Sequence, residues 1–167
     1  MPPEGTPAEG EPVLPRLESE GRALAAVDAV TPLDGRYRRV VEKLAPYFSE
    51  RALMSARLEV ETEYLIALSE EPWGPRAFTP EERAQLRAIP DITVGEANTV
   101  KAIEVKGYGE IPATNHDVKA VEYFIREKLR DSSLEDSVEW THWALTSEDA
   151  NNLSYALMLR RATEEVM

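Results

Sequence analysis

Residues 114–123 read TNHDVKAVEY, and this stretch decides how the whole chain is interpreted. Thr114 can cap a helix by accepting a hydrogen bond from a free amide of the first turn, and Asp117 stands three residues later, where its carboxylate can answer the cap. Apolar residues then recur at helical spacing and predict one buried face. They are Val118, Val121, Phe124, Ile125 and Leu129. The stretch therefore predicts an amphipathic helix that starts beside a polar triplet.

The polar triplet consists of Asn115, His116 and Asp117. In the first turn of a helix, unpaired backbone amides attract anions. An imidazole between an amide and a carboxylate at such a place can bind a ligand or transfer a proton. A capped surface helix whose histidine has no function explains the same residues and is the more frequent outcome. The local pattern alone leaves both interpretations open.

The composition excludes several classes of protein. A chain of 167 residues, 43% of them hydrophobic, can form one domain with a core and part of a second. The net charge of −12 argues against a general nucleic-acid-binding protein, because phosphate backbones need clustered lysine and arginine, but it permits a small anionic ligand. Without cysteine, neither disulfides nor thiolate metal sites can form. No membrane span or signal peptide is recognisable, so a cytoplasmic protein is expected.

Residues 1–22 are rich in proline, glycine and glutamate. Such a segment cannot bury enough apolar surface to offset its conformational entropy, and we expect a disordered extension.

The stretch 32–37 reads PLDGRY. Asp34 and Gly35 predict a tight turn in which the glycine is free to take a positive φ, followed by a short helix. The turn would present Arg36 and Tyr37 at a fixed place, and a planar guanidinium beside a phenol suits the recognition of phosphate or carboxylate. An exposed arginine next to a half-buried tyrosine is the simpler local interpretation.

Capping and breaking signals predict further helices over about residues 49–69, 80–89, 94–105 and 134–145. Ser49 would cap the first of these, and Thr79 with Glu82 would form a capping box at the second. The expected inner face of the first helix consists of Leu53, Val60, Tyr64 and Leu68.

In the helix predicted over residues 134–145, Glu139 and His142 would lie on one face. A metal site built from His116, His142 and acidic residues is conceivable. However, no spacing in the chain matches a known metal motif, and we expect no metal.

The stretch 146–152 reads TSEDANN and starts the last helix, with Thr146 and Asp149 as a capping pair. The hydroxyls of Thr146 and Ser147, with the backbone amides of a helix start, can hold a carboxylate, or they can be caps alone. No glycine, asparagine or proline ends this helix before Met167, so the chain is expected to stop in mid-helix.

Together, the stretches 32–37, 114–123 and 146–152 resemble, in order and spacing, the N-terminal third of the adenylosuccinate lyases in the fumarase and aspartase superfamily. The resemblance runs from about residue 25 to residue 167. It implies an all-α fold with an N-terminal helical domain over residues 23–133. Residues 134–167 would then form the start of the central helical bundle, with the chain truncated.

The resemblance also implies a function. It implies a lyase of purine biosynthesis that eliminates fumarate from adenylosuccinate, giving AMP, and from the succinyl-carboxamide intermediate. No metal or organic cofactor is implied. Arg36 and Tyr37 would hold the nucleotide through its phosphate, and Asn115, His116 and Asp117 would line the same pocket. His116 is the expected catalytic residue of this chain. Thr146 and Ser147 would bind the succinyl part.

The sequence departs from the family in that it lacks the family's other catalytic residues. The family's Ser-Ser-x-Met-Pro loop is absent from this sequence, and no histidine follows His142. The family also builds each site from three subunits of a homotetramer. We therefore expect a chain that is inactive alone and that belongs to a larger enzyme. The alternative is a truncated, non-catalytic paralogue that acts as an assembly or regulatory helical module.

Overall fold

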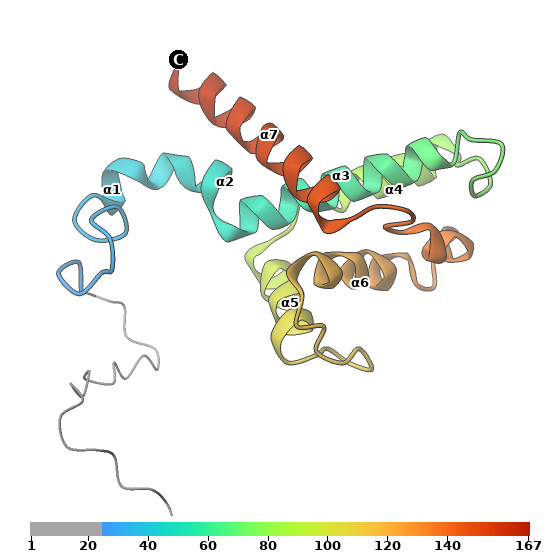
Figure 1. The fold of residues 1–167 in the computed structure, drawn as a ribbon, viewed down its shortest axis with the longest axis horizontal. Coiled ribbons are helices and arrows are strands. Elements are labelled where there is room, and N and C mark those ends of the chain that lie inside the picture. The colour runs from blue at the N-terminus through green and yellow to red at the C-terminus, as the bar shows by residue number, and fades with distance from the viewer. Residues whose placement is uncertain (1–24) are drawn as a thin grey trace, which may run out of the picture. The chain divides into compact units, whose positions relative to one another are not determined.

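The structure is a computed structural model that describes residues 25–167, so the tail predicted over residues 1–22 lies outside the described residues. Residues 25–167 form helices, turns and loops without a β-strand, apart from one isolated bridge between Tyr108 and Ile111 (Figure 1). The predicted all-α class is confirmed. The chain divides into two units, and the boundary between them falls between Val40 and Val41.

The described part of the first unit, residues 25–40, is a series of turns. The Tyr37 amide donates to the Pro32 carbonyl at 2.9 Å. Gly35 is buried, and its φ is not positive. A Cβ atom at this position would lie 2.4 Å from the Ala26 carbonyl oxygen. Glycine is therefore required because another backbone segment passes close by, and not for its freedom to take a positive φ.

Helices make up most of the second unit, and the short α1 crosses its boundary. The elements are α1 Arg38–Val41, the 3₁₀ helix η1 Glu42–Leu44, α2 Ala45–Phe48, α3 Glu50–Leu68, α4 Pro80–Ala88, α5 Val94–Val105, α6 Asp117–Leu129, the 3₁₀ helix η2 Glu135–Trp140 and α7 Ser147–Val166. Three predicted starts are confirmed. The Ser49 hydroxyl accepts from the Ala52 amide, Thr79 and Glu82 form a reciprocal capping box, and Thr146 pairs with Asp149.

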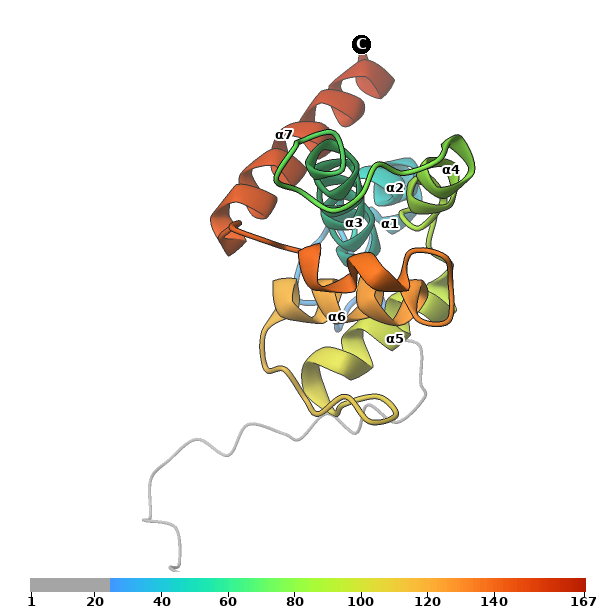
Figure 2. The same ribbon diagram turned by 90° about the vertical axis from the view of Figure 1, so that its right-hand side faces the viewer.

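Helix α3 lies in the middle of the second unit, with α5 and α6 on one side and α7 on another (Figures 1 and 2). Of its predicted inner face, only Leu68 is fully buried, and Leu53, Val60 and Tyr64 are half-buried. The core side chains of α3 are Met54, Leu58, Leu65 and Ile66. The prediction of this face was largely wrong, because a helix covered from several sides loses the single apolar stripe on which such a prediction depends.

Helix α6 packs against α5 (Figure 2). Its five predicted core residues are all buried, with exposed fractions of 4% or less. The amphipathic helix predicted behind the polar triplet is confirmed, and its inner face joins Val100 and Ile103 of α5 in the core.

The α-helix predicted over residues 134–145 was wrong. The chain forms the 3₁₀ helix η2 and then a turn in which His142 and Ala144 have left-handed φ values of 60° and 59°. Such residues cannot continue a right-handed helix. Tertiary contacts favour the turn, because Trp143 packs on Trp73 with ring centroids 5.4 Å apart and His142 contacts Glu61 of α3. Glu139 and His142 consequently share no face. Glu139 pairs with Arg126 and His142 with Glu61.

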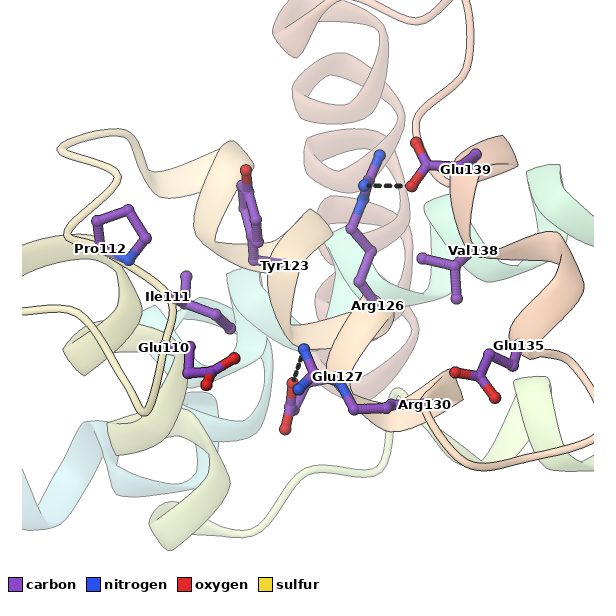
Figure 3. Close-up of a pocket in the computed structure, with 10 residues that line it drawn as sticks. All are labelled: Glu110, Ile111, Pro112, Tyr123, Arg126, Glu127, Arg130, Glu135, Val138 and Glu139. Carbon is purple, nitrogen blue, oxygen red and sulfur yellow. Dashed lines mark hydrogen bonds and ion pairs between the residues drawn. The ribbon is translucent and has the colours of Figure 1, made fainter.

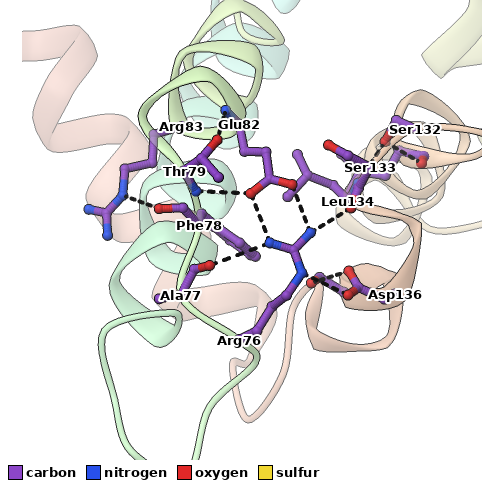
Figure 4. A network of polar contacts seen from close by, with 12 residues as sticks. Arg76, Ala77, Phe78, Thr79, Glu82, Arg83, Ser132, Ser133, Leu134 and Asp136 are labelled. Atoms are coloured by element: carbon purple, nitrogen blue, oxygen red, sulfur yellow. Dashed lines mark hydrogen bonds and ion pairs between the residues drawn. The ribbon is translucent and has the colours of Figure 1, made fainter.

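A polar network joins the start of α4 to the start of η2 (Figure 4). The guanidinium of Arg76 donates to both carboxylate oxygens of Glu82 at 2.7 and 2.8 Å. It also donates to Asp136 at 2.8 Å and to the Ser133 carbonyl at 2.5 Å. These bonds hold the pKa of Glu82 at about 2, chiefly through Arg76 and secondly through the Thr79 amide.

Among residues 25–167, none of the helices combines the length and the hydrophobicity that crossing a bilayer requires.

Candidate active site

The polar triplet lies in a turn that is attached to the end of α5. The Thr114 amide donates to the Ile103 carbonyl at 3.0 Å, and the Asn115 amide donates to the Glu104 carbonyl at 2.8 Å. Asn115 has a φ of 50°, a left-handed conformation that asparagine tolerates better than most residues. The backbone therefore holds the triplet in place before any side chain contributes.

His116, and not Thr114, caps helix α6. Its Nδ1 atom accepts a hydrogen bond from the Lys119 amide at 3.3 Å, and α6 begins at Asp117. The Thr114 hydroxyl instead donates to the His116 carbonyl at 3.0 Å. The predicted cap was wrong because the left-handed turn at Asn115 places Thr114 before the helix start and brings the imidazole over the first amides.

The capping bond assigns different roles to the two ring nitrogens of His116. Nδ1 is the acceptor in this bond, so a neutral ring would carry its proton on Nε2. The Nε2 atom lies 3.4 Å from the Ser147 hydroxyl oxygen at the start of α7. The structure thus brings together two of the predicted site segments, which are 31 residues apart in the sequence.

A buried arginine of α3 lies behind these segments. Arg57 donates through Nε to the Asn151 side-chain oxygen at 2.9 Å and pairs through Nη2 with the Asp117 carboxylate at 2.7 Å. Partial burial raises the pKa of Asp117, but the hydrogen bond and charge of Arg57, together with the Val118 amide, outweigh it and lower the pKa overall. Asp117 is therefore ionised at neutral pH.

The triplet lines a pocket of about 300 Å³ between α3, α5 and the start of α6. Its walls include Arg57 and Lys101, whose charges are already matched within the described residues. Lys101 contacts Glu50 at 2.8 Å and Glu104 at 2.9 Å, and Arg57 pairs with Asp117. Among the described residues, the pocket combines apolar and charged walls, and it has no excess of positive charge.

The start of α7 carries the other predicted pair. The amide and hydroxyl of Thr146 both donate to the Asp149 carboxylate at 2.8 Å, which lowers the pKa of Asp149. The hydroxyl of Thr146 thus already donates its proton to Asp149, whereas the Ser147 hydroxyl faces His116.

Arg36 and Tyr37 belong to the first unit, which ends at Val40. The guanidinium of Arg36 lies 4.5 Å from the centre of the Tyr37 ring and donates to the Tyr37 hydroxyl. Both side chains are exposed. An arginine stacked on a tyrosine is held ready for a ligand without being buried.

Sequence reasoning missed Arg57, Lys101 and the pair of Glu61 and His142. Glu61 is fully buried on α3, and its Oε1 lies 2.5 Å from His142 Nδ1. The hydrogen bond to Glu61 outweighs partial burial and raises the pKa of His142. The sequence offered no local signal for Arg57 and Glu61, because α3 contains six charged residues and only these two are buried.

A larger cavity, of about 500 Å³, lies along the outer side of α6 (Figure 3). It contains none of the predicted site residues, and its carboxylates, from Glu110, Glu127, Glu135 and Glu139, outnumber its arginines, Arg126 and Arg130. Arg130 pairs with Glu127 at 3.0 Å and Arg126 with Glu139 at 3.2 Å. The surplus of carboxylates disfavours an anionic ligand in this cavity, although the smaller pocket at the triplet also has one carboxylate more than it has cations.

Within residues 25–167, no group of three or more histidine, aspartate or glutamate side chains is arranged to hold a metal ion. His116 and His142 each contact different partners, Lys119 and Ser147 in one case and Glu61 in the other.

The chain is similar to several curated adenylosuccinate lyases. It is 38% identical to that of Legionella pneumophila (strain Corby) over 145 residues, 41% to that of Escherichia coli (strain K12) over 152, and 37% to that of Dictyostelium discoideum over 145. These matches cover 83–86% of the chain but only 30–31% of each relative, so the chain spans about a third of the length of the proteins it matches. No protein-family model matches the chain. Along most of its length, the chain is thus similar to an N-terminal portion of the adenylosuccinate lyases.

Proposed function

We propose that this chain is the N-terminal part of an adenylosuccinate lyase, a carbon–nitrogen lyase of purine biosynthesis. It would take part in eliminating fumarate from adenylosuccinate, giving AMP, and from the succinyl-aminoimidazole-carboxamide ribotide intermediate. The observation that carries the proposal is the 37–41% identity to adenylosuccinate lyases over most of the chain. The position of Asn115, His116 and Asp117 in one pocket beside Ser147 agrees with it.

Elimination of fumarate removes a proton from one carbon of the succinyl group and breaks the bond between the adjacent carbon and nitrogen. The nitrogen leaves with a proton, so the reaction needs a base and an acid within hydrogen-bond reach of those atoms. The family resemblance assigns both of these roles to residues outside this sequence. The residues of this chain would bind and orient the substrate, with His116 assisting the chemistry as a hydrogen-bond donor through Nε2.

The start of α7 is assigned to the succinyl carboxylate. A hydroxyl at a helix start, close to free backbone amides, suits a carboxylate because the peptide dipoles point their positive ends toward it. Ser147 is the first candidate for direct contact, since its only contact with the triplet is the 3.4 Å approach to His116. Thr146 would contact substrate only after its hydroxyl leaves Asp149.

Arg36 and Tyr37 are assigned to the nucleotide phosphate. The guanidinium of Arg36 is exposed and stacked on the Tyr37 ring, and a planar guanidinium can pair with two phosphate oxygens at once. We further propose that the enzyme is a cytoplasmic homotetramer whose substrate is a nucleotide, with neither nucleic acid nor membrane as a partner.

The test uses the full-length protein that contains this chain. The protein is purified from a host that lacks its own lyase. It should convert adenylosuccinate to AMP and fumarate, and the loss of adenylosuccinate is measured by absorbance. Arg36→Lys should raise KM for adenylosuccinate and do so much less for an analogue without the phosphate, because lysine cannot pair with two phosphate oxygens at once. Absence of turnover in the wild-type protein contradicts the function, and equal losses on both substrates contradict the role of Arg36.

A further inference from the structure

Arg57 is the only lysine or arginine that is buried among residues 25–167, with an exposed fraction of 4%. It lies on α3, in the core of the second unit, where an unpaired charge would be strongly destabilising. A buried guanidinium in a helix that otherwise supplies core side chains needs an explanation.

Both of its partners belong to the stretches that make up the candidate site. Asp117 is the last residue of the polar triplet and the first residue of α6, and it pairs with Nη2 at 2.7 Å. Asn151 lies in the second turn of α7 and accepts from Nε at 2.9 Å. Asn151 follows Ser147 by one helical turn, so its position fixes where the Ser147 hydroxyl lies.

The geometry points to a positioning role. We propose that Arg57 joins the first turn of α6 to the start of α7 and so keeps His116 Nε2 facing the Ser147 hydroxyl. The proposal rests on the proposed function in one respect, namely that His116 and Ser147 belong to a single substrate site. Arg57 acts through these two side chains and is a positioning residue.

The two contacts suit arginine. Nε and Nη2 donate to groups on two different helices, and a planar guanidinium holds both donors in one fixed geometry. A lysine ammonium is a single point charge on a flexible stem and would pair with Asp117 alone. Arg57→Lys therefore keeps the charge in the core while releasing the start of α7.

The chain provides a matched control in Arg161. This residue of α7 pairs with both oxygens of Glu59 on α3 at 2.7 and 2.8 Å, so it reproduces the link between α3 and α7 at a place away from the triplet and has no part in the link to α6. If Arg57 were only a bridge between helices, Arg57→Lys and Arg161→Lys would have the same consequences.

The first experiment is nitrogen NMR of the imidazole rings in the full-length protein, in which substitution of His116 or His142 assigns the signals of the two histidines of this chain. The wild-type His116 signals should show an unprotonated Nδ1 and a proton on Nε2. Arg57→Lys should move the His116 signals toward those of a free imidazole that exchanges between tautomers, with the His142 signals unchanged. Arg161→Lys should change neither histidine. Asn151→Ala removes only the hydrogen bond from Arg57 to α7 and should give a smaller change at His116. This variant replaces Arg57→Lys in the experiment if Arg57→Lys does not fold.

The second experiment measures turnover of adenylosuccinate by the full-length protein. Arg57→Lys should lower kcat by at least about tenfold, because misplacement of groups that orient a substrate is costly, whereas Arg161→Lys should leave kcat and KM within about twofold. If the wild-type protein has no activity, the proposed function fails, and the NMR result still decides the positioning role. The inference is overturned if His116 has the same signals in Arg57→Lys as in the wild type, or if Arg161→Lys changes them equally.

Discussion

Arg76 and Arg57 both join segments that are far apart in the sequence, but they use their guanidinium groups differently. Arg76 is 40% exposed and makes a closed network with Glu82, Asp136 and the Ser133 carbonyl, all at helix starts or turns (Figure 4). Arg57 makes fewer bonds, and each goes to a residue of a candidate site stretch. The comparison teaches that the location of the partners, and not the number of hydrogen bonds, distinguishes a positioning residue from one that only supports the fold.

The largest expected effect is on turnover, and it comes from His116, the side chain that Arg57 is proposed to position. His116→Gln in the full-length protein should lower kcat about a hundredfold or more, the usual loss when a group that handles protons or polarises substrate is removed. The same change removes a helix cap, which costs about 1 kcal/mol and lowers the melting temperature by a few degrees. Kinetics and thermal unfolding of the same preparation check both. Unchanged turnover, or loss of folding, would make His116 a structural residue only.

The next effect concerns the Arg76 network. Arg76→Met should lower the free energy of unfolding, because the nearly buried carboxylate of Glu82 loses both hydrogen bonds from the guanidinium. Urea unfolding measures this. Arg83→Met is the control, since Arg83 lies in the same helix and pairs with the exposed Glu70, and it should cost less than about 1 kcal/mol.

The same Arg76 variant sharpens the comparison further if His116 is observed by NMR. We expect its imidazole signals to be unchanged in Arg76→Met and altered in Arg57→Lys. Equal changes in both variants would remove the distinction between the two arginines.

A smaller effect should appear in acid. Because Arg76 and the Thr79 amide hold the pKa of Glu82 at about 2, below its ordinary value of 4.5, the ionised carboxylate stabilises the folded state above pH 4.5. That contribution should be lost as the pH falls from 4.5 to 2. Urea midpoints measured between pH 6 and pH 3 should therefore fall less steeply in Arg76→Met than in the wild-type chain. An identical pH dependence in both proteins would show that Glu82 does not titrate in this way.

The smallest expected effect comes from the pair of His142 and Glu61. The pKa of His142 is raised chiefly by its hydrogen bond to Glu61, so the pair stabilises the fold fully below pH 6.5 and loses this contribution as the pH rises through the raised pKa. An NMR titration of the two histidines should place His142 above 6.5, and Glu61→Gln should lower that value. Titration of His142 at 6.5 or below in the wild-type chain would contradict the pairing.

Local chemistry allowed much of this chain to be predicted. The capping box at Thr79, the caps at Ser49 and the pairing of Thr146 with Asp149 were predicted because each involves groups only three residues apart. The inner face of α6 was predicted because this helix has a single apolar stripe. The all-α class and the relation to adenylosuccinate lyases followed from the same short motifs.

What the sequence by itself determined is therefore where most helices begin and which side of α6 is buried. Only the tertiary structure decided the cap at His116, the turn at His142 and the contacts of Arg57. Each of these depends on groups brought together from distant parts of the chain, such as the α5 carbonyls that hold Asn115 and the α3 carboxylate that holds His142. Local propensity differs by under about 1 kcal/mol between most residues, so a few such contacts are enough to override it.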